Sequence, residues 1–425
     1  MKRLVCLFVC MCMIFVLASC AGEMKGSYDA PKGEASMDGG HYNGAWDAPM
    51  ADAEMSPEAP GEVAGDKETP SPETLRPKAG MITAGAHNDN TYYDGWLELF
   101  LEDGKFYGYD WDIWHFDSLQ RVKVTVKNGG NALAGEKVTL HNDAETVVGR
   151  AVTDANGVAY LFAPPQQGGM TVRLGNAVQT LSEDTAEVTF DLTKENQKKN
   201  KIELMLVVDV TGSMGDELTF LQKELENVID RVAFDNANAE IMLSLLFYRD
   251  HGDADVFSFH DFTKVNTATA FDKMQKELAK QHADGGGDTP EAVDEALKMA
   301  MDASWSKEAT TKIIFHVLDA PPHTAKKYGD TYYAAVQSAA EQGIRICPVL
   351  CSGADHLTEY LTRQAALYTG GTFVFVTDHS GIGGAHHDPD LPNVTVEYLN
   401  DLMVRLVNGY HTGTFKAPVS YTQSK

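Results

Sequence analysis

Five consecutive apolar residues, Leu204–Val208, constrain the fold of this chain more than any other feature. A run so short and so rich in branched side chains is typical of a strand that is buried on both faces of a parallel sheet. A helical period of apolar residues follows it, comprising Leu218, Leu221, Leu225, Val228, Ile229 and Val232. The pattern predicts a strand–turn–helix unit, and such units build α/β sheets that bind ligands beyond the carboxyl ends of their strands.

The turn between this strand and this helix carries an oxygen donor at every second position. These donors are Asp209, Thr211 and Ser213, with Val210 and Gly212 between them. One carboxylate and two hydroxyls suit a hard cation such as Mg²⁺, which prefers oxygen ligands in octahedral geometry. A motif this short recurs by chance. It supports a metal site only if further oxygen donors follow the other predicted strands.

Two later stretches also carry oxygen donors, one at the start of a predicted helix and one at the end of a predicted strand. Thr289 follows the glycine run 285–287 at the start of a predicted helix, and Asp319 ends the apolar strand Ile313–Leu318. Because the carboxyl ends of parallel strands meet at one edge of a sheet, we expect Asp319 to lie beside Asp209. The sequence therefore predicts a five-residue cation site, assembled from three loops.

This set of motifs resembles the metal-ion-dependent adhesion site of the von Willebrand factor A domain. The family pattern is DxSxS, then Thr, then Asp, and here Thr211 takes the place of the first serine. The resemblance implies a site for Mg²⁺, or for Mn²⁺ or Ca²⁺, in which an Asp or Glu of a protein partner completes the coordination. Its implied ligands are Asp209, Thr211, Ser213, Thr289 and Asp319. Apart from the resemblance, His323 lies just after Asp319 and is a candidate for the partner-binding rim, with a solvated loop histidine as the alternative; Asp288 is a second rim candidate.

An alternative hypothesis is that this turn carries the nucleophile of an enzyme. The segment Thr211–Gly215 resembles a degenerate G-x-S-x-G elbow, in which Ser213 attacks and Asp319 and a later histidine, such as His356 or His386, complete a triad. This hypothesis leaves Asp209 and the glycine run unexplained. We therefore expect a binding protein without catalytic residues rather than a serine hydrolase.

The fold class predicted for residues 200–410 is a doubly wound, Rossmann-like α/β domain with six strands, followed by a tail, 411–425. Pro348 conflicts with its place inside a strand, where proline fits only an edge or a bulge. Beyond the first strand and helix, the predicted strands are Glu240–Tyr248, Val256–Phe262, Ile313–Leu318, Ile344–Leu350 and Phe373–Val376. The predicted helices are Thr269–His282, Pro290–Ala303, Tyr332–Gln342 (ended by Gly343), His356–Tyr368 and Val394–Val407.

Two segments precede this domain. Residues 119–193 show seven short strand patterns separated by turn signals, which predicts a small all-β sandwich. They resemble the prealbumin-like, carboxypeptidase-regulatory and bacterial Ig-like repeats, which implies a spacer. Residues 81–118, here called the aromatic strap, are dense in Trp, Tyr and Phe. We expect an irregular segment that packs on the following domain; a sugar-binding or partner-binding surface is the alternative.

The amino terminus predicts a lipid anchor. Lys2 and Arg3 precede an apolar run, and Leu17–Cys20 resembles the lipobox of bacterial lipoproteins. The resemblance implies that residues 1–19 are a signal peptide and that Cys20 is lipidated, which places the chain in the cell envelope, at the outer membrane or cell surface rather than the inner membrane. Residues 20–80 are rich in Pro, Gly and acidic residues and predict a disordered tether.

The net charge and the cysteine content argue against some classes of function. The net charge of −26 becomes −28 without residues 1–19, which argues against binding nucleic acid or anionic lipid by charge. If Cys347 and Cys351 lie on one strand, their Cα atoms are too far apart for a disulfide, so we expect two buried thiols unless the chain turns sharply at Leu350. Histidines and acidic residues crowd the loop 377–391, where a second metal site is an alternative to a flexible polar loop.

Overall fold

A computed structural model defines residues 76–109, 111–164, 169–182, 185–265, 267–287 and 289–423. The chain divides into two compact units, Met1–Lys67 and Glu68–Lys425, and every described residue belongs to the second. The predicted signal peptide, Cys20, most of the predicted tether and Asp288 lie outside the described residues. No helix in the described part of the chain is long and apolar enough to cross a membrane.

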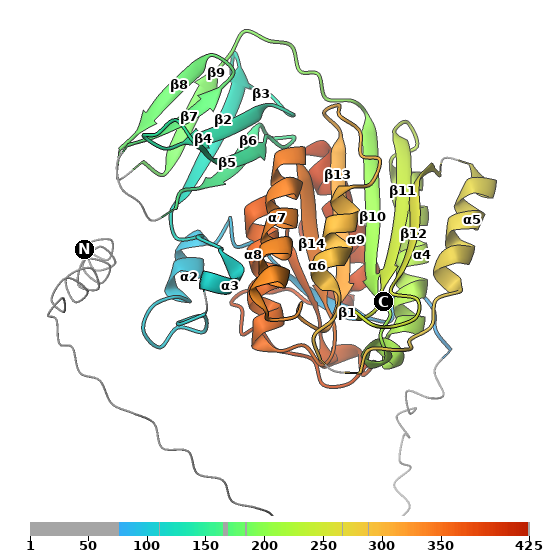
Figure 1. The fold of residues 1–425 in the computed structure, drawn as a ribbon. Helices are drawn as coiled ribbons and strands as arrows, with labels where there is room; N and C mark the ends of the chain where they lie inside the picture. Colours follow the sequence, from blue (N-terminus) through green and yellow to red (C-terminus); the bar gives the residue numbers. More distant parts are fainter. Residues whose placement is uncertain are drawn as a thin grey trace, which may run out of the picture. The chain divides into compact units, whose positions relative to one another are not determined.

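An eight-stranded sheet forms the centre of the second unit (Figure 1). Its strands, in spatial order, are β12 (Phe257–Lys264), β11 (Glu240–Tyr248), β10 (Lys201–Asp209), β13 (Thr311–Leu318), β14 (Ile344–Leu350), β15 (Phe373–Val376), β1 (Thr83–His87) and β16 (Glu397–Tyr398). The five strands from β11 to β15 in this order are parallel, whereas β12, β1 and β16 each pair antiparallel with a neighbour. The predicted α/β character is confirmed, but the prediction of six strands was wrong, because two further strands complete a mixed sheet.

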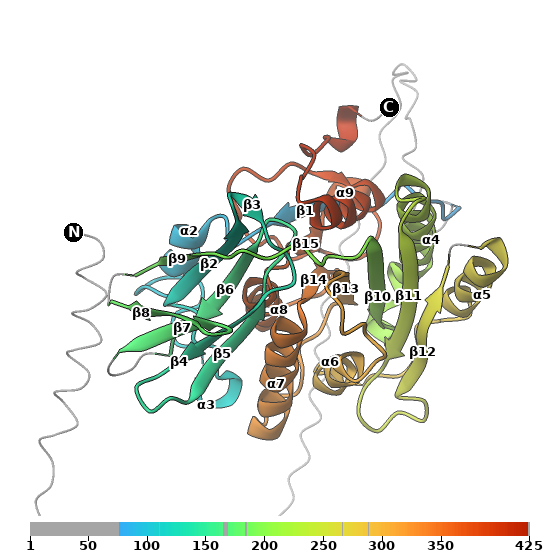
Figure 2. The same ribbon diagram turned by 90° about the horizontal axis from the view of Figure 1, so that it is seen from above.

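Helices cover both faces of this sheet (Figure 2). Helices α4 (Leu218–Asp235), α5 (Ala268–Ala279) and α9 (Leu399–Thr412) share one apolar core with residues such as Leu204 and Leu206 of β10. Helices α6 (Val293–Met301), α7 (Lys326–Gln342) and α8 (His356–Thr369) share another with Met205 and Val207. Alternate residues of β10 therefore enter opposite cores, as expected for a strand that is buried on both faces.

Helix α7 begins at Lys326 rather than at the predicted Tyr332, and two other helices begin later than predicted. Helix α6 begins at Val293 rather than at Pro290, because Glu291 forms a bridge with Pro322 and donates its backbone N–H to Pro321. Helix α9 begins at Leu399 rather than at Val394, since the residues just before it form strand β16 on β1. In both places a long-range pairing overrides the local helical pattern.

Pro348 lies inside strand β14, as the sequence suggested, and the sheet accommodates it. The ladder to β13 continues through the pair His316 and Pro348. On the other side, β15 pairs only with Val349 and Leu350. Pro348 therefore occupies a position where its missing N–H removes no ladder hydrogen bond.

The aromatic strap is more regular than expected. It contributes β1, which enters the sheet between β15 and β16, and the short helices α2 (Tyr93–Glu98) and α3 (Trp111–Trp114). Several of its aromatic side chains are buried in the same core as Tyr332 and Tyr360, namely Trp96, Phe106, Trp114 and Phe116. The strap packs on the α/β domain, and it also completes the sheet of that domain.

Two four-stranded sheets follow the strap and enclose a core of their own. One contains β2 (Arg121–Asn128), β3 (Asn131–Ala132), β6 (Val158–Phe162) and β9 (Glu187–Asp191). The other contains β4 (Lys137–His141), β5 (Val147–Val152), β7 (Met170–Leu174) and β8 (Ala177–Leu181). The ring of Phe162 stacks on Tyr368 of α8, which fixes one contact between these sheets and the α/β domain.

The two cysteines of the described chain are both buried and unbonded, as predicted. Burial raises the pKa of the Cys347 thiol to about 11. A thiol with so high a pKa forms little thiolate, so these side chains contribute to packing rather than to redox chemistry.

Candidate metal centre

Asp209 and Asp319 lie side by side at one edge of the sheet because their strands are parallel neighbours. Asp209 is the last residue of β10, and Asp319 follows the last residue of β13. Both side chains are buried, with exposed fractions of 0% and 5%. This edge is where ligands bind in open α/β sheets.

The turn after β10 is organised around Asp209. Its Oδ1 accepts hydrogen bonds from the Thr211 backbone N–H at 2.9 Å and from Thr211 Oγ1 at 2.7 Å. Thr211 Oγ1 lies 3.1 Å from Ser213 Oγ, and Ser213 is hydrogen-bonded to Asp319. The structure therefore joins four of the five predicted ligands into one chain of contacts.

Four carboxylate oxygens at or beside this edge have no hydrogen-bond partner in the described structure. They are buried oxygens of Asp209 (Oδ2), Asp319 (Oδ1), Glu291 (Oε2) and Glu217 (Oε2). A buried, unpaired carboxylate oxygen is costly, since it has lost its water without gaining a donor. A divalent cation with oxygen ligands would satisfy such atoms, so the donor set fits Mg²⁺, Mn²⁺ or Ca²⁺.

The raised pKa values of the carboxyl groups show that this site favours a positive charge. Burial and the neighbouring carboxylates raise the pKa values of Asp209 and Asp319. Burial and the nearby Asp209 and Asp250 raise the pKa of Glu291 to about 9. Arg249 opposes these shifts at Asp209, but its guanidinium donates to the backbone carbonyls of Asp284 and His282.

The glycine run 285–287 closes over the turn. All three residues have positive φ angles, which a side chain would strain. A Cβ on Gly286 would lie 3.0 Å from Glu291 Oε1 and 3.4 Å from Thr211 Cβ. The Gly212 N–H donates to the Gly285 carbonyl at 3.2 Å, so only glycine permits this approach of the two loops.

Thr289 and His323 stand apart from the other predicted residues. Thr289 is exposed just after the glycine run, and the hydrogen bonds described for this loop do not join it to Asp209 or Asp319. His323 Nε2 lies 2.7 Å from Asp250 Oδ1, and its ring packs against Tyr328. His323 is therefore engaged with Asp250 at the rim, and Asp288 lies outside the described residues.

Two buried carboxylates beside this site, those of Glu291 and Glu217, are not among the predicted site residues. Glu291 follows the glycine run and shares the site, and its adjacency to Thr289 was the available signal. Glu217 is buried behind Asp319, and its charge raises the pKa of that aspartate. Its Oε1 accepts from the Ser352 N–H at 3.1 Å and contacts His386 Nε2 at 2.7 Å, which no sequence pattern predicts.

The hydrolase alternative requires a histidine beside Ser213. In the described structure, the hydrogen bonds of Ser213 reach Thr211 and Asp319. His386 instead bridges Glu217 and Asp378, and the His356 ring packs against His387. Neither of the two candidate histidines is hydrogen-bonded to the proposed nucleophile.

The fold and the site together define an α/β domain that carries a cluster of oxygen donors at the carboxyl edge of its sheet. Residues 203–377 match the model of the von Willebrand factor A domain family. The chain therefore contains a von Willebrand factor A domain.

Several individual proteins are similar to part of the chain. A protein of Acanthamoeba polyphaga mimivirus, named as an ariadne-like RING finger protein, is 29% identical over 132 residues, which are 31% of this chain and 12% of that protein. BatB from Bacteroides thetaiotaomicron gives a TM-score of 0.32 at 15% identity, over 41% of this chain and 90% of that one. The pilus adhesin SpaC from Lactobacillus rhamnosus GG gives 0.29 at 13% identity, over 42% and 32%.

Proposed function

We propose that this chain is a lipid-anchored envelope protein that binds a protein partner through a divalent cation in its von Willebrand factor A domain. The proposed ligands are Asp209, Thr211, Ser213, Thr289 and Asp319, and the preferred cation is Mg²⁺. The observation that carries this proposal is the set of buried carboxylate oxygens without hydrogen-bond partners on Asp209 and Asp319.

The number of ligands in the donor set explains how a partner is recruited. Two carboxylates and three neutral hydroxyls supply five oxygen ligands, which leaves the sixth position of an octahedral Mg²⁺ for a further oxygen ligand. The exposed rim near Thr289 is the open side, since Asp209 and Asp319 are buried. An Asp or Glu side chain of the partner supplies the remaining ligand, and its interaction with this site therefore requires the metal.

The rest of the chain supports presentation of this site. The segment 20–80 tethers the folded part to a lipid at Cys20. Because β1 follows this segment directly and lies in the central sheet, the tether joins the α/β domain itself, and the two small sheets between residues 121 and 191 do not separate that domain from the anchor as a spacer would. A coil of about 60 residues spans roughly 40–45 Å on average, which holds the binding edge away from the membrane surface.

Metal binding is tested by thermal unfolding of the full chain during titration with Mg²⁺ and Mn²⁺. The full chain is required because β1 lies outside residues 200–410 and completes the sheet. A cation that binds only the folded state raises its stability by about 2.7 kcal/mol at a hundredfold excess over the dissociation constant. Asp209→Ala should abolish this rise, whereas Asp230→Ala, which removes an exposed carboxylate of α4, should leave it unchanged.

Partner binding is tested by cross-linked capture with the wild-type chain and with Asp209→Ala. The expected result is a partner that is retained in Mg²⁺, released by EDTA and absent from the Asp209→Ala capture. A midpoint of unfolding that does not rise with metal in the wild type contradicts the metal site. Capture that is equal with and without EDTA contradicts metal-dependent recognition while leaving metal binding intact.

A further inference from the structure

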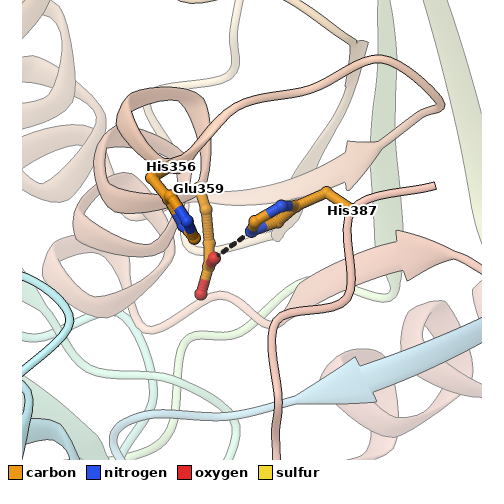
Figure 3. A group of neighbouring side chains, drawn as sticks. All are labelled: His356, Glu359 and His387. Atoms are coloured by element: carbon orange, nitrogen blue, oxygen red, sulfur yellow. Dashed lines mark hydrogen bonds and ion pairs between the residues drawn. The ribbon is translucent and has the colours of Figure 1, made fainter. Parts of the chain in front are cut away.

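A second group of potential metal ligands lies at the amino end of helix α8, away from the residues described above. Glu359 lies three positions after His356, about one turn further along this helix, and His387 approaches both from the loop 377–391 (Figure 3). One ligand atom from each side chain lies within 4.8 Å of the others. The two imidazoles and the carboxylate point toward one another in the close-up.

The loop that carries His387 is held at both ends. Before His387, Ser352 and His386 form a bridge, and the Gly353 N–H donates to the Ala385 carbonyl at 3.1 Å. After it, Leu391 and Val394 pack against a core cluster that contains Leu350, Ala354 and Phe373. The position of His387 therefore follows from tertiary contacts and needs no metal to bring it near α8.

The Glu359 carboxylate forms ion pairs with two basic side chains, Arg363 and Lys105. Arg363 Nη1 donates to Glu359 Oε1 at 3.0 Å, and both side chains are almost completely buried. Oε2 contacts His387 Nε2 at 2.5 Å and Lys105 Nζ at 2.6 Å. Lys105 also donates to the Pro389 carbonyl at 3.2 Å, so its ammonium keeps a partner if it leaves the carboxylate.

The chemistry of the three groups selects the class of ion. Imidazole nitrogen suits Zn²⁺ and similar transition metals, whereas Mg²⁺ prefers oxygen ligands only. Ligand atoms of a tetrahedral zinc site are about 3.3 Å apart, given bonds of about 2.0 Å. His387 Nε2 and Glu359 Oε2 are closer than this, at 2.5 Å, so the half-buried His387 ring must rotate away from the carboxylate to admit the ion.

We propose that His356, Glu359 and His387 bind a Zn²⁺-class transition-metal ion, independent of the site at Asp209. Three protein ligands leave one position for water or an exogenous ligand, as in open zinc sites. Arg363 holds the carboxylate in place through its other oxygen, a role that partners of ligating groups commonly fill. Lys105 competes with the ion for Glu359 Oε2 and limits the affinity.

The test is titration of the full chain with Co²⁺ and Zn²⁺ in an Asp209→Ala background, which removes the first metal site. One equivalent of Co²⁺ should produce the visible absorption of a nitrogen-ligated, low-coordinate ion, and one equivalent of Zn²⁺ should displace it. His356→Gln and His387→Gln should each weaken binding more than tenfold, since loss of an outer partner alone costs about 10-fold to 100-fold. Lys105→Met should tighten binding severalfold, because it removes the competing ammonium.

The matched control is His379→Gln, which removes an exposed histidine of the same loop whose ring packs against Tyr421. It should bind Co²⁺ as the parent does. Both ligand histidines are at least partly exposed, so their variants should fold, and circular dichroism verifies this. The proposal is overturned if no equivalent of Co²⁺ or Zn²⁺ binds, or if His356→Gln and His387→Gln bind as tightly as His379→Gln.

Discussion

Asp89 and Arg363 form a buried ion pair that fastens the segment after strand β1 to helix α8. Arg363 Nη2 lies 2.5 Å from Asp89 Oδ1 and Arg363 Nε lies 3.1 Å from Oδ2, and the exposed fractions of the side chains are 2% and 1%. Burial acts to raise the pKa of Asp89, but Arg363 and His87 together outweigh this effect and lower it. The aromatic strap is therefore an integral part of the α/β domain.

Removal of one partner of this pair should destabilise the whole unit. Asp89→Ala leaves a buried guanidinium with only Glu359 as a charged partner, and we expect a loss of about 3 kcal/mol in the free energy of unfolding. Arg150→Ala, which breaks the exposed pair with Glu341, should cost less than about 1 kcal/mol. Denaturant unfolding measures both, and equal losses would contradict the structural role of Asp89.

Glu224 of α4 should hold the start of β1 in place. Its buried carboxylate accepts from the backbone N–H groups of Gly80, Met81 and Ile82 at 2.8–2.9 Å. Glu224→Ala leaves these donors unsatisfied, so we expect faster amide hydrogen exchange in β1 and a loss of about 2 kcal/mol in stability. Glu226→Ala on the same helix, where the carboxylate binds only Lys223 among the described contacts, is the control and should leave exchange in β1 unchanged.

The raised pKa of Glu291 should make stability depend on pH in metal-free buffer. A carboxyl whose pKa is about 9 in the folded state and about 4 when unfolded destabilises the fold as pH rises between these values. Glu291→Gln removes this titration. The free energy of unfolding of the Glu291→Gln variant, minus that of the wild type, should therefore increase as the pH rises from 5 to 9, by up to about 1.4 kcal/mol per pH unit. A difference that stays constant over this range would show that Glu291 is ionised throughout.

Ser213 should not behave as a catalytic nucleophile. Its hydrogen bonds reach Thr211 and Asp319, with neither candidate histidine bonded to it. A serine-reactive fluorophosphonate should therefore leave Ser213 unlabelled under conditions that label an active serine hydrolase. Stoichiometric labelling that Ser213→Ala abolishes would favour the hydrolase.

The lipid anchor is tested at Cys20. Because Leu17–Cys20 resembles a lipobox, Cys20→Ser should block maturation or release the protein from the membrane fraction. Membrane fractionation and the intact mass of the wild type measure this. Unchanged fractionation together with a wild-type mass that lacks a lipid adduct would rule out the anchor.

Local patterns in the sequence determined the centre of the α/β domain. The apolar run Leu204–Val208 lies within β10, and the strands predicted for Glu240–Tyr248 and Ile344–Leu350 are present at those residues. The positions of Asp209 and Asp319 at strand ends followed from the same patterns, since a parallel sheet places such ends at one edge. Periodicity reports burial, and burial on both faces is what a central parallel strand requires.

Only the tertiary structure decided the contacts between residues that are distant in the chain. The short β1 segment, TAGAH, carries almost no strand pattern and is a strand because β15 and β16 pair with it. The burial of Glu291 and the approach of His387 to Glu359 depend on loops that are held by long-range hydrogen bonds and packing. Sequence patterns report the periodicity of a single element, whereas these residues acquire their environment from neighbours that the fold alone brings together.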